Sequence, residues 1–297
     1  MNSSFLFITL FLLFSPEWAF LVKGRSGLTF LYMAEEAQKL NADLDEIVQE
    51  ESFDESEIKL LREMAEKGIM YGHKKNRTNP KFKPYIFATR NGLEIIDLGK
   101  TVKGLETAIE FLKKQLSENK TVLLIGMQPA SWESMGELAK KYNFSMAKNG
   151  WIGGLLTNFK NVSQRIEYFK KLRDGMAKGE FEKYTKKERV MISKNIEKMK
   201  LMFEGLENLV KIPDVVFVID TALKSHVTAI KEAKLLNIPV IAVMDSDDDP
   251  ERAKYVIPAN DHSKLSIDWI MEKIGQELSS VKISENINKP QSTDSGK

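Results

Sequence analysis

A run of cations between His73 and Arg90 contains the residue types that point most directly to chemistry. The run has no Asp or Glu, although the whole chain carries a formal net charge of only +2. Because Lys and Arg neutralise phosphates, the run favours contact with a nucleic-acid backbone over a catalytic pocket. The alternative is a solvated basic loop without a ligand. The candidate binding residues in the run are His73, Lys74, Lys75, Arg77, Lys81, Lys83 and Arg90.

Residues that could catalyse a reaction or bind a metal are sparse. The chain has no Cys, its three His residues are widely separated, and no Ser lies in a Gly-x-Ser-x-Gly motif, so we expect neither a catalytic site nor a cofactor. Asp220 and Asp245 follow two predicted strands and should lie at the same edge of a sheet. They could bind a hard cation, or zinc if His73 reaches them. Aspartates that follow strands more commonly cap the next turn, so we expect no metal site.

The elements that must position these residues alternate between strands and helices. Short apolar runs predict strands at 121–125, 144–147, 215–219, 240–244 and 255–257. Helical periodicity appears at 56–67, 101–112, 130–138, 227–236 and 263–278. This alternation predicts an α/β fold with a doubly wound, largely parallel sheet of the Rossmann or flavodoxin type.

The basic run itself should have a different local structure. Pro80 and Pro84 are expected to keep its backbone extended and to exclude an α-helix. Residues 85–88 and 93–96 then flank Arg90-Asn91-Gly92, which predicts a β-hairpin.

A nucleotide-binding enzyme is the main alternative function for such a sheet. The turn after the first parallel strand, Ile125-Gly126-Met127-Gln128-Pro129, has one Gly where a dinucleotide-binding fingerprint needs three, and Gly-Lys-Ser/Thr does not occur. A Rossmann-like enzyme or binding protein for a phosphorylated or nucleotide ligand therefore remains the second hypothesis.

Residues 160–211 interrupt the alternation with two amphipathic helical patterns separated by Gly175 and Gly179. The patterns predict an antiparallel coiled-coil hairpin inserted into the α/β domain. The segment contains fourteen Lys or Arg and eight Asp or Glu, so its net charge is +6. This charge could simply keep the helices soluble, but together with the basic run it favours phosphate contact. The candidate contacts are Lys160, Arg165, Lys170, Lys171 and Arg173.

Several motifs, in order and spacing, resemble the small-subunit ribosomal protein S2 family of bacterial type. The resemblance extends from Ile58 to about Ile270 and is specific only in combination. Two positions depart from many bacterial relatives, because Met127-Gln128-Pro129 replaces a basic turn and Gly150 replaces an Arg. The motifs are Gly72-His73, Asn79-Pro80-Lys81, Lys83-Pro84-Tyr85-Ile86-Phe87, Arg90-Asn91-Gly92, Ile95-Ile96-Asp97-Leu98, Trp151 to Phe159, Pro213 to Asp220, His226, Asn237 to Val240, Asp245, Asp249-Pro250 and Val256 to Asp261.

The resemblance implies a non-catalytic structural component of the small ribosomal subunit. It implies binding to small-subunit rRNA, with Trp151 and Asn158 added to the candidate RNA contacts. It also implies contacts with neighbouring small-subunit proteins and docking of ribosomal protein S1 where that protein is present. No small-molecule substrate and no membrane are expected, and the location is the cytoplasmic ribosome.

The sequence suggests five regions. Residues 1–32 form an apolar segment that reads either as a start placed too far upstream or as a signal-like segment. Residues 33–57 hold ten acidic residues against Lys39 alone and predict a mobile extension. Residues 58–159 and 212–280 are expected to form the α/β domain, 160–211 the helical protrusion, and 281–297 a disordered tail.

Overall fold

The computed structural model describes residues 55–280 of this chain, which divides into two compact units between Ala65 and Glu66. Helix α3 (Glu55–Glu66) ends at this boundary and buries Leu61, Met64 and Ala65, the apolar face expected for residues 56–67. Within the described part of the chain, no helix is both long and apolar enough to cross a bilayer. The predictions for residues 1–32 and 281–297, and most of that for 33–57, lie outside the described residues.

A five-stranded sheet forms the centre of the second unit. Its strands occur in the order β5-β4-β6-β7-β8, and every neighbouring pair is parallel. All residues of β4, β6 and β7 are buried, as expected for continuous apolar runs covered on both faces. The predicted parallel α/β fold is therefore confirmed. The strands are β4 (Val122–Ile125), β5 (Ser145–Ala147), β6 (Val215–Ile219), β7 (Val240–Met244) and β8 (Tyr255–Pro258).

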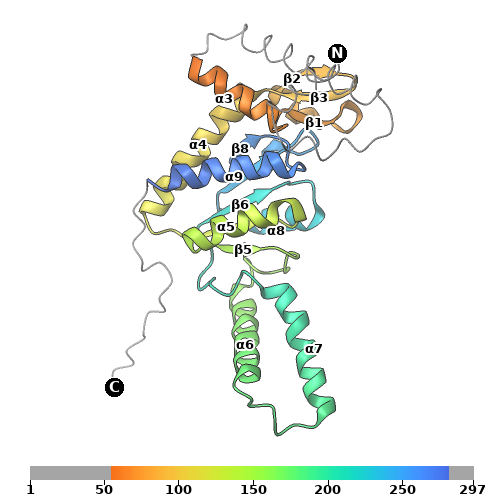
Figure 1. The fold of residues 1–297 in the computed structure, drawn as a ribbon, viewed down its shortest axis with the longest axis vertical. Helices are drawn as coiled ribbons and strands as arrows, with labels where there is room; N and C mark the ends of the chain where they lie inside the picture. The colour runs from red at the N-terminus through yellow and green to blue at the C-terminus, as the bar shows by residue number, and fades with distance from the viewer. Residues whose placement is uncertain (1–54, 281–297) are drawn as a thin grey trace, which may run out of the picture. The chain divides into compact units, whose positions relative to one another are not determined.

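Helices cover both faces of this sheet (Figure 1). Helix α8 (Lys224–Leu235) shares a buried core with alternate residues of β4, β6 and β7, including Leu123, Val216 and Ala242. Helices α4 (Leu98–Ser117), α5 (Trp132–Tyr142) and α9 (Lys264–Leu278) group on the other face, where α9 contacts both of the others. Short 3-10 helices η4 (Pro129–Ser131) and η5 (Pro250–Arg252) follow β4 and β7.

A second, antiparallel sheet contains β1 (Tyr71–Lys74), β3 (Leu93–Ile96) and β2 (Ile86–Arg90) in that order. The predicted hairpin is confirmed: Asn91 and Gly92 connect β2 to β3 with φ of 51° and 77°, the left-handed values that a tight hairpin turn needs. Strand β1 was not predicted, because four residues with little apolar character give no strand signal.

The prediction of an extended basic run was wrong. Its backbone forms two 3-10 helices, η2 (Lys75–Arg77) and η3 (Pro80–Tyr85). Proline fits the first position of such a helix because the missing N–H would have no partner there. The Asn79 side chain accepts a hydrogen bond from Lys81 N at 3.0 Å, which caps η3 and starts the turn.

The start of α4 also differs from the predicted helix, whose periodicity began at residue 101. Asp97 is the cap, because its side chain accepts a hydrogen bond from Lys100 N at 3.2 Å. Thr101 is fully buried one turn later and donates to the Pro258 carbonyl oxygen of β8 at 2.6 Å. The hydroxyl therefore joins the helix to the sheet instead of beginning the helix.

Helices α6 (Phe159–Ala177) and α7 (Lys186–Phe203) interrupt the α/β alternation between β5 and β6 (Figure 1). The two helices contact each other, with the rings of Phe169 and Phe203 at 6.0 Å between centroids. The Thr185 hydroxyl and the Glu188 carboxylate cap the start of α7 reciprocally. Two helices were predicted here, although α6 continues through Gly175.

Two helical glycines test the packing of this fold. A Cβ at Gly104 of α4 would clash with the Val256 carbonyl oxygen of β8, so Gly104→Ala should reduce the free energy of unfolding by more than about 1 kcal/mol. A Cβ at Gly136 of α5 meets no atom within 4 Å, so Gly136→Ala should stabilise by about 0.5–1 kcal/mol through helix propensity. Urea denaturation of both variants measures the difference, and effects of equal sign would contradict this packing.

Candidate nucleic-acid interface

The antiparallel sheet collects part of the basic run at one end. Lys74 of β1 and Arg90 of β2 both pair with Leu93 of β3, so the two cations flank one exposed apolar residue. Lys75 follows directly and its backbone N–H donates to the Gly92 carbonyl oxygen at 2.9 Å. The strand spacing places the Lys74 and Arg90 backbones about 10 Å apart. These residues, distant by sixteen positions in sequence, form what we call the hairpin-end cation group: Lys74, Lys75 and Arg90.

The cations of the run differ in whether they form ion pairs inside the protein. Lys74, Lys75, Arg77 and Lys83 are exposed, and within residues 55–280 they have no ion-pair partner. Lys81, by contrast, lies 2.5 Å from a Glu251 carboxylate oxygen and 3.5 Å from one of Asp249. The Glu251 hydrogen bond raises the pKa of Lys81, and this cation is therefore less available to a phosphate than its neighbours.

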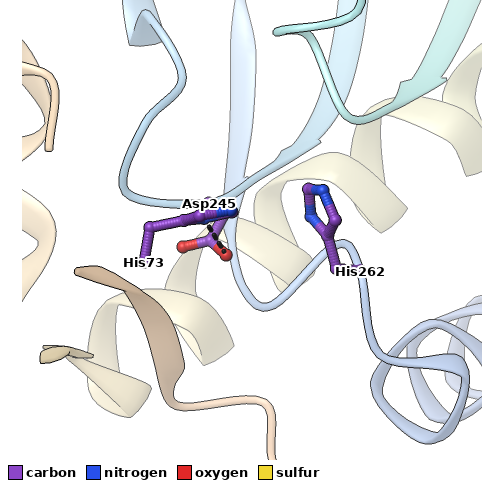
Figure 2. A group of neighbouring side chains, drawn as sticks. All are labelled: His73, Asp245 and His262. Atoms are coloured by element: carbon purple, nitrogen blue, oxygen red, sulfur yellow. Dashed lines mark hydrogen bonds and ion pairs between the residues drawn. The ribbon is translucent and has the colours of Figure 1, made fainter. Parts of the chain in front are cut away.

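His73 connects the start of the basic run to the loop after β7 (Figure 2). Its Nδ1 lies 3.0 Å from Asp245 Oδ2 and 3.4 Å from Asp247 Oδ1, and its backbone N–H donates to Ser246 Oγ at 2.7 Å. The Asp245 hydrogen bond, opposed by burial, raises the pKa of His73. His73 thus anchors the run, and its position does not make it an exposed RNA contact.

His262 completes a donor cluster that the sequence analysis missed. One ligand atom each of His73, Asp245 and His262 lie within 4.8 Å of one another, with His262 on the loop before α9 (Figure 2). Two imidazoles and a carboxylate are a donor set that zinc accepts. The sequence paired His73 with Asp220 and Asp245, because nothing in the spacing showed that residue 262 returns to this edge.

The carboxyl edge between β4 and β6 is the usual ligand position in a sheet of this order. Here the protein's own groups bridge it: the Met127 backbone N–H donates to His226 Nε2 at 3.3 Å, and the Gln128 side chain hydrogen-bonds to Asp220. His226 is fully buried, burial lowers its pKa, and its other ring nitrogen meets the Asp220 carbonyl oxygen. His226 is therefore buried with both ring nitrogens engaged inside the protein, which gives it a structural role at this edge.

Aspartates at this edge mainly fix loops. Asp220 accepts from Ala222 N at 2.7 Å, and Asp248 accepts from the Thr221 hydroxyl at 2.6 Å and from Asp245 N at 3.2 Å. Burial raises the pKa of Asp248 to about 6, against the opposing effect of the Thr221 hydrogen bonds, and burial also raises that of the neighbouring Asp261. These carboxyl groups cap turns, as the sequence analysis expected for aspartates that follow strands.

Helix α6 holds the remaining predicted cations. Lys160, Arg165 and Lys171 are exposed, and the Arg165 guanidinium lies 5.9 Å from the centre of the Phe203 ring. Lys170 is half-buried. Arg173 donates to both Glu207 carboxylate oxygens at 2.7 and 2.6 Å, so it braces α6 against the segment after α7.

Trp151 and Asn158 frame the loop that leads into α6. The Trp151 indole N–H donates to Glu232 of α8 at 2.9 Å, so this group is already used inside the protein. Asn158 is exposed, and its backbone N–H donates to the Gly154 carbonyl oxygen at 2.8 Å. The polar N–H of Trp151 is therefore engaged inside the protein, whereas Asn158 is exposed at the start of α6.

Comparison with known proteins identifies the family. A family model described as Ribosomal protein S2 matches residues 64–280. The chain belongs to the ribosomal protein S2 family. The S2 match includes the basic run, both sheets and the helix pair, and thus everything described above except most of α3.

Curated S2 relatives agree with this match. A protein of Petrotoga mobilis described as small ribosomal subunit protein uS2 is 40% identical over 218 residues, which cover 73% of this chain and 75% of the relative. One of Dictyoglomus thermophilum with the same description is 40% identical over 219 residues, covering 74% and 88%. One of Geotalea uraniireducens is 38% identical over 218 residues, covering 73% and 84%.

Membership of the S2 family confirms the predicted resemblance and the predicted role as a structural ribosomal protein rather than an enzyme. It also agrees with the expected location on the ribosome. The carboxyl edge of the sheet agrees with this role. At the position where a sheet of this order usually binds a nucleotide, His226 and Gln128 hydrogen-bond to the protein's own groups.

The titration of Asp248 gives a testable pH dependence. Its folded pKa of about 6 lies above the unfolded value of 3.8, so the folded state holds a proton that the unfolded state loses first. Stability from this group is present at low pH and lost as the pH rises from about 4 to about 6. Relative to Asp248→Asn, the wild-type free energy of unfolding should fall across that window in chelator-treated buffer. Parallel profiles from urea denaturation would contradict the shift.

Proposed function

We propose that the chain binds small-subunit rRNA through the hairpin-end cation group, together with Arg77 and Lys83 of the same basic run. The observation that carries this proposal is the exposed position of Lys74, Lys75, Arg77 and Lys83, which have no ion-pair partner within residues 55–280, in a chain of the S2 family. Such cations neutralise phosphates and fix orientation on folded RNA without reading its sequence.

The second proposed RNA-binding surface is the helix pair α6 and α7, which we take as a coiled-coil protrusion over residues 160–211. Lys160, Arg165 and Lys171 are exposed on α6 and contribute positive charge to its surface. Residues 58–159 and 212–280 would then form the α/β domain that carries the protrusion. Asn158, at the base of α6, remains a proposed contact.

Four predicted contacts have a smaller proposed share in RNA binding. His73 and Lys81 contact the acidic loop after β7, Trp151 contacts Glu232, and Arg173 contacts Glu207. A phosphate would have to replace these partners, which costs part of its own binding free energy. We therefore propose that these residues position the basic surfaces and that Lys74, Lys75, Arg77 and Lys83 supply most of the attraction.

Docking of ribosomal protein S1 and contacts with neighbouring small-subunit proteins complete the proposal. Their support is the family resemblance: the relatives are described as small ribosomal subunit proteins. Capture of S1 by the immobilised full chain, compared with capture by the same chain after Lys74, Lys75 and Arg77 are replaced, would separate protein docking from RNA-mediated association.

The RNA proposal predicts a salt-dependent effect of charge removal. In filter binding with a small-subunit rRNA transcript, Lys74→Ala/Lys75→Ala/Arg77→Ala should weaken binding at every salt concentration. The slope of log affinity against log salt should decrease in magnitude by about 2–3, since each lost phosphate contact contributes about 0.7–0.9. Lys81→Ala alone should change affinity less than Lys75→Ala, because Lys81 is paired with Glu251.

A matched variant removes the same charge elsewhere. Lys140, Lys224 and Lys231 are exposed on α5 and α8, outside the basic run and outside residues 160–211. Their triple replacement by Ala should leave the salt slope nearly unchanged. Equal losses in the two triple variants would mean that net charge, and not the hairpin-end surface, governs binding, and would overturn the proposal.

A further inference from the structure

A single buried carboxylate holds the loop that leads into helix α6. Glu232 of α8 is 7% exposed, and its two oxygens accept five hydrogen bonds from residues 151–157. The donors are the Trp151 indole N–H at 2.9 Å, Gly154 N at 2.8 Å, Leu156 N at 3.1 Å, and Thr157 N and Oγ1, both at 3.2 Å.

These donors account for the ionised state of a buried acid. Burial opposes ionisation of Glu232, but the hydrogen bonds from Trp151 and the loop backbone outweigh it, and the pKa of Glu232 is lowered. Three of the donors are backbone N–H groups of an irregular loop, and the buried one of Leu156 in particular needs a partner inside the protein. The carboxylate therefore replaces the regular hydrogen bonding that this loop lacks.

The loop connects β5 to α6, and core packing holds it beside the Glu232 contact. Leu155 and Leu156 are buried in the same core as Ala229 and Ala233 of α8. Helix α6 begins at Phe159, two residues after Thr157. Any movement of the loop relative to α8 would thus be passed directly to the start of α6.

The return end of the helix pair is fixed by a different contact. After α7, the Gly205 carbonyl oxygen accepts from Met146 N of β5 at 2.8 Å, and Gly205 has φ of +85°. A Cβ at this glycine would clash with the Met146 carbonyl oxygen, so the chain passes β5 at close range. One end of the pair is therefore attached to α8 by Glu232 and the other to β5 by main-chain bonding.

We propose that Glu232 is the positioning residue of the helix pair, setting the direction in which α6 and α7 extend from the parallel sheet. Glu232 itself offers no exposed group to RNA, so it acts only through the loop at residues 151–157. The inference deepens the proposed function, since the direction of the pair decides whether its cations reach RNA. Its test, however, uses the free protein.

Glu232→Gln is the sharpest variant because it keeps size and shape. A glutamine provides one acceptor oxygen and turns an N–H₂ group toward backbone N–H donors, so several of the five bonds must be lost. The chain has no cysteine, so spin labels can be attached to Glu110→Cys on α4 and Lys187→Cys on α7 without other changes. Pulsed electron–electron double resonance then measures the distribution of distances between the label on α4 and the label on α7.

The distance distribution should be narrow in the labelled parent chain. In Glu232→Gln its width should increase by a factor of about two or more, because the loop is no longer held against α8. Glu94→Gln is the matched control, because Glu94 of β3 in the other sheet is also buried, at 4% exposure, and accepts from the Thr78 and Thr89 hydroxyls. It should lower stability without broadening the distribution.

An unchanged width in folded Glu232→Gln would overturn the inference, because Glu232 would then contribute to stability without setting the direction of the helix pair. If that variant does not fold, Trp151→Phe and Thr157→Val each remove one side-chain donor, and both should broaden the distribution by a smaller factor. Unchanged widths in these two would equally overturn it. Because no RNA is present, failure of the rRNA-binding proposal would not alter any of these outcomes.

Discussion

The pairing of β6 with β4 on one side and β7 on the other is the interaction on which the rest of the structure depends. Both ladders are parallel and all five residues of β6 are buried, so the strand requires cover on both faces. Helix α8, which follows β6 directly, supplies part of that cover and places Glu232 against the loop before α6. The β7 end likewise places Asp245 against His73. Both basic surfaces are thus positioned from neighbouring strands of one sheet.

Carboxylates have a consistent role in this cationic family member. Glu232, Asp248 and Asp97 each accept hydrogen bonds from backbone N–H groups of loops or helix starts. Acids used in this way hold irregular backbone in place while contributing little negative charge to exposed surfaces. The exposed Lys74, Lys75 and Lys83 then face solvent without acidic partners within residues 55–280. This division suits a protein whose proposed partner is a polyanion.

The turn after β4, which the family resemblance led us to expect to be basic, makes contacts inside the protein. Gln128 hydrogen-bonds to Asp220, and the Met127 backbone N–H donates to His226, so the turn after β4 contacts the protein's own β6 end. The turn Met127-Gln128-Pro129 therefore serves internal packing. The same contacts use polar groups at the edge where a sheet of this order usually binds a ligand.

Local sequence determined much of the fold and little of the site. The strands at 215–219 and 240–244 were predicted with the observed bounds because each is a continuous apolar run, and Asn91-Gly92 fixed the hairpin because few residues adopt positive φ. Helical periodicity indicated the two helices between β5 and β6. The motifs also sufficed to identify the family, since their order along the chain survives without coordinates.

Tertiary structure alone decided which predicted site residues act together. Lys74 and Arg90 lie beside Leu93 because β1 joins the hairpin, and β1 has no apolar pattern that could reveal it. Lys81 is paired with Glu251, and His73 approaches Asp245 and His262, across more than 160 sequence positions. Glu232 looked like one more charge on an amphipathic helix. Periodicity reports which face of an element is buried, whereas the partner of a polar side chain depends on how separate elements pack, and that information is not local.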